Sequence, residues 1–253
     1  MRNIKKDLEA LLKELHLPTV RDSYEDLARQ AEQEGQSYEQ FLLELVEMES
    51  QARRARRLER MLRQSKLPPD KTLASFDLKR IPVKVRQQVK TLLDGAFLDR
   101  KENVLAFGQP GTGKTHVLCA IGQELIYHDR KVYFASTQLM VQELLIAKRD
   151  LALSRFLKKL SRFDALILDD LGYVQQNREE MEVLFTLLAE RYERGSVMIT
   201  SNLPFSKWEG IFKDPMTTAA AIDRLVHHSV ILELNVPSFR VEQAKKGQKQ
   251  AQN

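Results

Sequence analysis

Apolar residues recur at helical spacing through the first quarter of the chain. They form three stripes, each with members three or four residues apart as on an amphipathic helix, and Pro18 and Gly35 separate the stripes. Pro68 follows the third stripe. The pattern predicts a small all-helical N-terminal domain over residues 1–66, followed by a link at 67–75.

Beyond the link, short uninterrupted apolar runs alternate with further helical stripes. A strand that faces water on one side alternates apolar and polar residues, whereas these runs do not, so they predict parallel strands buried on both faces. This order of elements indicates an α/β fold. Residues 137–162 are predicted to form an additional helical block that is amphipathic and basic. The predicted strands are 104–107, 165–170, 197–200 and 230–234.

The strongest chemical signal follows the first of these strands, where the chain matches the phosphate-loop pattern G-x-x-x-x-G-K-[ST]. Its glycines allow the backbone N–H groups to point at phosphate oxygens, and the start of the next helix adds a positive dipole end. Lys114 supplies a cation for the β- and γ-phosphates, and the hydroxyl of Thr115 supplies a ligand for Mg²⁺. The predicted nucleotide-binding residues are Gly108, Gln109, Pro110, Gly111, Thr112, Gly113, Lys114, Thr115 and His116.

Polar residues at later strand ends complete the predicted site. Asp169 and Asp170 follow four apolar residues, and we expect Asp169 to hold Mg²⁺ and Asp170 to orient the attacking water. Asn202 follows the next strand and can hydrogen-bond that water or the γ-phosphate. Arg224 has two readings: a surface residue paired with Asp223, or an arginine finger offered to a neighbouring subunit.

Composition supports a full hydrophobic core and an anionic partner. Of the 253 residues 43% are hydrophobic, and the net charge is +5. Residues 53–66 hold seven basic side chains and one acidic one, after a strongly acidic stretch. This basic run is either a solvated face that pairs with the acidic helices or a surface for nucleic-acid phosphates. The same two readings apply to the basic side chains of 137–162. The DNA-binding candidates are Arg53, Arg54, Arg56, Arg57, Arg60, Arg63, Lys148, Arg149, Lys158 and Lys159.

Several classes of protein are excluded by what the sequence lacks. Cys119 is the only cysteine, which rules out a disulfide framework and suits a reducing, cytoplasmic setting. No apolar run reaches 18 residues, so no membrane partner is expected. The five histidines show no metal-ligand spacing, so we expect no metal held by histidine.

With these residues in view, the chain resembles the IstB-like transposition helper ATPases, a branch of the AAA+ proteins related to DnaC and DnaA. The resemblance rests on residues 108–115, 166–173, 191–208 and 222–228. It implies a P-loop AAA+ three-layer αβα core with a parallel sheet over 67–240, preceded by the helical domain and followed by a flexible basic tail at 241–253.

The resemblance also assigns roles to single residues. Lys114 and Thr115 match Walker A, Asp169 and Asp170 match Walker B, Asn202 matches the first sensor, and Arg224 matches the arginine finger in trans. The stretch 235–240 matches the family's terminal Ser-aromatic-Arg pattern only loosely, which leaves the role of Arg240 open. In DnaA-like proteins, a helix inserted at the place of 137–162 wedges between neighbouring subunits.

The implied function is ATP- and Mg²⁺-dependent. The resemblance implies a homo-oligomer that assembles with ATP on duplex DNA, with little sequence preference, and assists an IstA-like DNA transposase in insertion-sequence transposition. A DnaC-like helicase loader is the alternative within the same fold, and the block 191–208 favours the transposition branch. A third reading is an ATP-gated interaction protein that does not hydrolyse ATP, against which the acidic pair at 169–170 argues.

Overall fold

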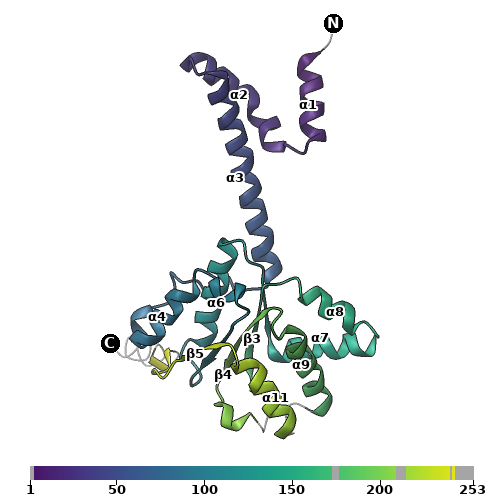
Figure 1. The fold of residues 1–253 in the computed structure, drawn as a ribbon. Coiled ribbons are helices and arrows are strands. Elements are labelled where there is room, and N and C mark those ends of the chain that lie inside the picture. The colour runs from purple at the N-terminus through teal and green to yellow at the C-terminus, as the bar shows by residue number, and fades with distance from the viewer. Residues whose placement is uncertain (1–2, 173–176, 209–214, 240, 243–253) are drawn as a thin grey trace, which may run out of the picture. The chain divides into compact units, whose positions relative to one another are not determined.

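The computed structural model describes residues 3–172, 177–208, 215–239 and 241–242 (Figure 1). The chain divides into two units between Arg60 and Met61. Tyr173, Arg240 and most of the predicted basic tail lie outside the described residues. The first unit is helical throughout its described part, and the second holds the sheet, as the apolar pattern predicts.

Three helices make up the N-terminal region: α1 (Ile4–Glu14), α2 (Pro18–Glu34) and α3 (Tyr38–Ser65). Pro18 occupies the first position of α2, where its missing N–H costs nothing because that group has no partner within a helix. Gly35 ends α2 in the left-handed conformation, with φ 64°. Leu12 and Leu45 are buried in the first unit.

A buried carboxylate from α3 caps the start of α2. Leu17 is the N-cap residue of α2 and has no side-chain oxygen for the free N–H groups. Glu49 replaces that cap, because its Oε2 accepts hydrogen bonds from the N–H of Thr19 at 2.8 Å and of Val20 at 3.3 Å. Burial raises the pKa of Glu49, but the hydrogen bonds from Arg53 and from these N–H groups outweigh burial, so its pKa lies below the usual value.

A five-stranded parallel sheet in the order β2-β3-β4-β1-β5 forms the centre of the second unit. Most residues of the three central strands β1, β3 and β4 are buried, which explains their uninterrupted apolar character. The observed parallel sheet confirms the predicted α/β class. The strands are β1 (Asn103–Phe107), β2 (Val132–Ser136), β3 (Ala165–Leu171), β4 (Ser196–Ser201) and β5 (Ser229–Glu233).

Helices cover both faces of this sheet. In Figure 1, α4 and α6 lie on one face, and α7, α9 and α11 lie on the other. The three-layer αβα arrangement is therefore confirmed. Within the described residues, no helix has the length and apolar content needed to cross a bilayer. The remaining elements are η1 (Leu78–Arg80), α4 (Val83–Leu92), α5 (Ala96–Asp99), α6 (Lys114–Tyr127), α7 (Thr137–Arg149), α8 (Leu153–Leu160), α9 (Arg178–Arg191), η2 (Phe205–Lys207) and α11 (Pro215–Val226).

The interpretation of residues 137–162 as an additional helical block is wrong for its first half. Helix α7 is the ordinary crossover between the neighbouring parallel strands β2 and β3, and it packs against both strands and α9. Met140 and Leu144 of α7 are fully buried. Helix α8 is the additional element, and Leu160 is its one buried residue.

Candidate functional site

The phosphate loop occupies residues 108–113, between the end of β1 and the start of α6. Gly108 and Gly113 have φ angles of 156° and 96°. A Cβ on Gly108 would lie 2.6 Å from the carbonyl oxygen of Leu234, and one on Gly113 would lie 2.8 Å from the ring of Phe76. Both positions therefore require glycine, and the loop can follow a phosphate group closely.

Lys114 begins α6 and lies along the loop. Its Nζ donates hydrogen bonds to the carbonyl oxygens of Gly108 at 2.8 Å and Gln109 at 3.0 Å, and its side chain is buried. Thr112 also stabilises the loop, because its hydroxyl donates a hydrogen bond to the carbonyl oxygen of Gln109 at 2.9 Å. Thr115 is half-buried in the first turn of α6. The predicted cation and hydroxyl thus stand at the N-terminus of a helix that follows a strand.

The acidic pair lies in a β-bulge of β3. Leu168 pairs with Ile199 and Leu171 with Ser201, so Asp169 and Asp170 together face the single residue Thr200 of β4. Asp170 adopts φ 59°, a left-handed conformation that costs a non-glycine residue about 1–2 kcal/mol.

Thr200 holds both acidic residues in place. Its Oγ1 accepts a hydrogen bond from the N–H of Asp170 at 2.8 Å and donates one to Oδ1 of Asp169 at 2.6 Å. Thr137 at the start of α7 donates to the carbonyl oxygen of Asp169 at 2.9 Å. Both threonines are buried. The sequence analysis assigned no role to either threonine. For Thr200, the sequence did offer one sign of such a role, because its hydroxyl lies at the end of the predicted strand that precedes Asn202.

Strand order brings the predicted groups to one edge of the sheet. Strand β4 lies between β3 and β1, and the carboxyl ends of parallel strands meet at the same edge. Asn202 directly follows β4 and is half-buried, so it stands between the acidic pair and the phosphate loop. Ser201 fixes this end of β4 because its hydroxyl donates to the carbonyl oxygen of Leu171 at 2.8 Å.

The segment that sequence analysis treated as a link forms a wall of the phosphate loop. His116 points into it: its Nε2 lies 3.0 Å from the carbonyl oxygen of Thr72 and 3.2 Å from the hydroxyl of Ser75. The ring centroids of His116 and Phe76 are 5.0 Å apart. His116 therefore braces the wall from α6 through its ring nitrogen.

The chain after β5 forms a second wall. The N–H of Phe239 donates to the carbonyl oxygen of Gly111 at 2.9 Å. Arg80 lies over the Phe239 ring at 4.8 Å from its centroid and forms an ion pair with Glu242 at 2.7 Å. These contacts hold η1 and the chain after β5 next to the phosphate loop.

Arg224 lies at the opposite end of the sheet. Its backbone carbonyl is 3.5 Å from the side-chain amide of Asn103, the first residue of β1, whereas the phosphate loop follows the last residue, Phe107. At about 3.3 Å per residue, these two ends of β1 are about 13 Å apart. The Arg224 guanidinium is half-buried over the ring of Phe185, 4.9 Å from its centroid. The structure thus separates Arg224 from the other predicted site residues of its own chain.

The DNA-binding candidates of α3 fall into two groups. Arg53 donates to Glu49 at 2.8 Å, and Arg56 donates to the hydroxyl of Thr19 at 2.9 Å, so both bind within the first unit. The other candidates of α3 recur every three residues and, like Arg53 and Arg56, are exposed: Arg54, Arg57, Arg60 and Arg63.

The candidates of the second unit are also at the surface. Lys148 at the end of α7 forms an ion pair with Glu182 of α9 at 2.8 Å. Arg149, Lys158 and Lys159 are exposed. The only cysteine, Cys119, is buried within α6, and burial raises the pKa of its thiol to about 12, so it has no thiolate for chemistry.

Comparisons with known proteins identify relatives along nearly the whole chain. Residues 10–247 match the family described as IstB-like ATP binding protein. An insertion sequence ATP-binding protein of Sinorhizobium fredii is 44% identical over 92% of this chain and 78% of its own length. The insertion sequence IS21 ATP-binding protein of Pseudomonas aeruginosa is 36% identical over 95% of this chain and 91% of its own.

Solved structures share the fold at low sequence identity. The crystal structure of the DnaC helicase loader superposes with a TM-score of 0.56 at 17% identity, covering 65% of this chain and 97% of that one. The structure of AMPPCP-bound DnaA from Aquifex aeolicus superposes with a TM-score of 0.57 at 21% identity, covering 73% of this chain and 56% of that one. These likenesses show that the second unit shares the fold of DnaC and DnaA.

Proposed function

The chain belongs to the family of IstB-like ATP-binding proteins, and from this premise we propose that it is a Mg²⁺-dependent ATPase that assembles on duplex DNA and assists the transposase of an insertion sequence. The observation that carries the proposal is the acidic bulge of β3, positioned by Thr200 at the same sheet edge as the phosphate loop. The names of its relatives support the insertion-sequence context and favour it over helicase loading.

The residues present fit ATP with Mg²⁺. The glycine loop admits phosphate oxygens where a Cβ would collide with neighbouring atoms. The hydroxyl of Thr115 and the carboxylate of Asp169 are hard oxygen ligands of the kind Mg²⁺ prefers. When bound, Mg²⁺ neutralises charge on the β- and γ-phosphate oxygens. In this proposal Lys114 leaves its loop carbonyls to contact the same oxygens, and Thr200 keeps Asp169 oriented.

Asp170 is the proposed base for hydrolysis. Its carboxylate is exposed at the sheet edge, so it can accept a hydrogen bond from water. The water oxygen bonds to the γ-phosphorus while the bond to the β–γ bridging oxygen breaks, and the water proton passes to Asp170 before release to solvent. The products are ADP and inorganic phosphate. Asn202 holds the water or the γ-phosphate from the neighbouring strand end.

Assembly would place Arg224 at the nucleotide of another subunit. The length of β1 separates Arg224 from its own phosphate loop by more than an arginine side chain covers, which supports a role in trans. Arg224→Ala is therefore expected to lower turnover and leave ATP affinity unchanged. An equal loss of affinity and turnover would assign Arg224 to its own subunit's site.

Asp170→Asn tests the enzymatic part of the proposal. We expect this variant to bind ATP as the wild type does and to release no phosphate, with or without duplex DNA. If the wild-type protein itself releases no phosphate in the presence of Mg²⁺ and duplex DNA, the protein is an ATP-gated binding protein and not an ATPase. Light scattering of the protein with duplex DNA tests assembly: ATP should give a larger complex than ADP or no nucleotide.

DNA binding is assigned to the exposed arginines of α3. Reversing Arg54, Arg57 and Arg60 to Glu is expected to weaken binding of every duplex and to reduce the salt slope by about 3, since each lost phosphate contact releases about one counterion fewer. The matched control reverses three exposed lysines, Lys79, Lys84 and Lys90. An unchanged slope in the α3 variant, or an equal loss in the control, would contradict this assignment.

A further inference from the structure

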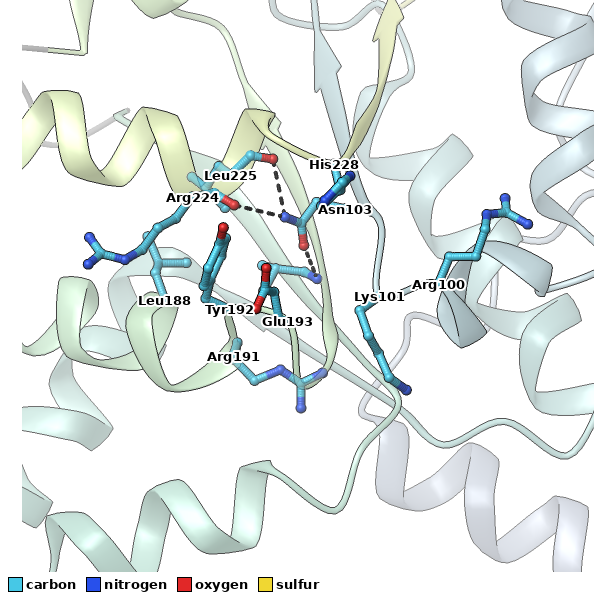
Figure 2. A pocket seen from close by; sticks show the side chains of 11 residues that line it. Arg100, Lys101, Asn103, Leu188, Arg191, Tyr192, Glu193, Arg224, Leu225 and His228 are labelled. Atoms are coloured by element: carbon cyan, nitrogen blue, oxygen red, sulfur yellow. Dashed lines mark hydrogen bonds between the residues drawn. The ribbon is translucent and has the colours of Figure 1, made fainter.

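Two turns at the end of the sheet opposite the phosphate loop bring three metal-ligating side chains together. Glu193 lies in the turn between α9 and β4, and His227 and His228 lie between α11 and β5. One carboxylate oxygen and one ring nitrogen from each histidine all lie within 4.8 Å of one another, and all three side chains are exposed. Figure 2 shows Glu193 and His228 beside a pocket of about 220 Å³.

Asn103 holds the turn that carries the histidines. Its backbone N–H donates to the carbonyl oxygen of His228 at 2.7 Å. Its side-chain amide donates to the carbonyl oxygen of Leu225 at 3.1 Å and accepts from the N–H of Val197 at 2.8 Å. Figure 2 shows the hydrogen bonds from the Asn103 side chain to Arg224 and Leu225 near the end of α11. Together with the bond from Val197, they link the end of α11 to the start of β4.

Arg191 anchors the turn that carries Glu193. Its buried guanidinium donates to the carbonyl oxygens of Phe163 at 2.8 Å and of Ser196 at 3.0 Å. Glu193 follows in the left-handed conformation, with φ 56°. The backbone on both sides of the three side chains is therefore fixed by buried hydrogen bonds, and only the side chains need to move to close around an ion.

We propose that Glu193, His227 and His228 form a binding site for a divalent transition metal of the zinc type. Two imidazole nitrogens and one carboxylate oxygen are a ligand set that Zn²⁺ uses with a fourth position open to water. Imidazole favours Zn²⁺, Ni²⁺ and Cu²⁺ over Mg²⁺ and Ca²⁺. Ligand atoms about 2.0–2.1 Å from a tetrahedral ion are about 3.3 Å apart, which rotation of exposed side chains can reach.

Neighbouring groups support the ligands. The hydroxyl of Tyr192 lies 3.3 Å from Nδ1 of His227, and metal-binding histidines commonly have a partner on their second ring nitrogen. Glu102 lies close enough to interact electrostatically with His228, and Asp223 interacts in the same way with Tyr192. These carboxylates add negative charge around the ion and offset Arg100, Lys101 and Arg224 of the adjoining pocket.

The site is separate from the proposed nucleotide site and does not depend on it. An ion here would join the turn before β4 to the turn before β5 and restrain the end of α11, two residues beyond Arg224. Loss of this site would leave ATP affinity unchanged.

The proposal is tested by titrating Zn²⁺ into the untagged full-length protein. Excess Mg²⁺ saturates sites made of oxygen ligands, and a chelating dye competes for the Zn²⁺. We expect one Zn²⁺ per chain, and at least a tenfold weaker affinity in His228→Gln and in Glu193→Gln. His128→Gln is the control, because His128 is equally exposed but lies at the end of α6. It should bind Zn²⁺ as the wild type does. Ca²⁺ should not compete.

Co²⁺ gives a second readout that does not depend on activity. A tetrahedral Co²⁺ complex absorbs visible light strongly, and this band should be present in the wild type and absent in His227→Gln. Urea unfolding of each variant without metal, compared with the wild type, checks its fold. Zinc affinities that are equal in the wild type and in folded variants, or no zinc bound at all, would overturn the proposal.

Discussion

Replacement of Thr200 by Val tests how the acidic bulge is held, because Val keeps the shape of Thr and removes its hydroxyl. The variant loses the hydrogen bond to the Asp169 carboxylate, worth about 1.5–3 kcal/mol, and leaves the N–H of Asp170 without its partner, at about 1–3 kcal/mol. The added buried methyl offsets about 1 kcal/mol. We expect a net loss of about 1.5–5 kcal/mol in the free energy of unfolding.

The same change should act more strongly on Mg²⁺-dependent chemistry than on nucleotide binding. With Asp169 free to rotate, turnover should fall at least tenfold, or about 1.4 kcal/mol, while ATP binding without Mg²⁺ stays at the wild-type level. Urea unfolding can be followed by the fluorescence of Trp208, the only tryptophan, which is fully buried in the second unit.

Thr200→Ser is the matched control for this experiment. Ser keeps the hydroxyl and loses one methyl group, so it should retain the turnover of the wild type and lose about 1 kcal/mol of stability. Equal turnover in Thr200→Val and wild type would refute the positioning role of Thr200. Equal defects in Thr200→Val and Thr200→Ser would attribute the effect to packing and not to the hydroxyl.

Three further outcomes follow from the structure. Arg191→Ala should lower the free energy of unfolding by about 3–4 kcal/mol in urea, because carbonyl oxygens lose their buried donor, whereas Arg194→Ala should change it by less than about 0.5 kcal/mol. Glu49→Gln should lower the free energy of unfolding of the N-terminal helices by about 1 kcal/mol, measured by circular dichroism. Because the pKa of Glu49 is lowered in the folded state, the stability that Glu49 contributes is present above its unfolded pKa and is lost as the pH falls through its folded pKa. The Gln variant should lack this loss of stability in acid. Gly113→Ala should abolish ATP binding in calorimetry, because its Cβ collides with Phe76; wild-type affinity would show that the loop opens freely.

The strands and the phosphate loop could be predicted because their signals are local. A buried parallel strand is a continuous apolar run, and the loop pattern lies within eight consecutive residues at 108–115. The helical N-terminal region could likewise be predicted, from the spacing of its apolar residues. The pairing of Arg56 with Thr19 could not be predicted in this way, because these two residues lie 37 positions apart.

The parts that the sequence did not predict depend on pairing between distant segments. The bulge exists only through the register of β3 against β4, which sets Thr200 opposite two residues that lie 30 and 31 positions earlier. Phe76 and Arg80 became walls of the loop through contacts with α6 and with the chain after β5. Histidine spacing alone predicted no metal site; the site proposed above adds Glu193, which lies 34 residues before His227.

The most direct test of the account is calorimetric titration of ATP into the full-length protein with Mg²⁺, for the wild type and for Lys114→Ala. Because the proposed site holds the triphosphate against Lys114 and the glycine loop, we expect saturable binding of one ATP per chain in the wild type and at least a tenfold loss of affinity in the variant. Equal affinity in the two proteins, or no binding by the wild type, would contradict it.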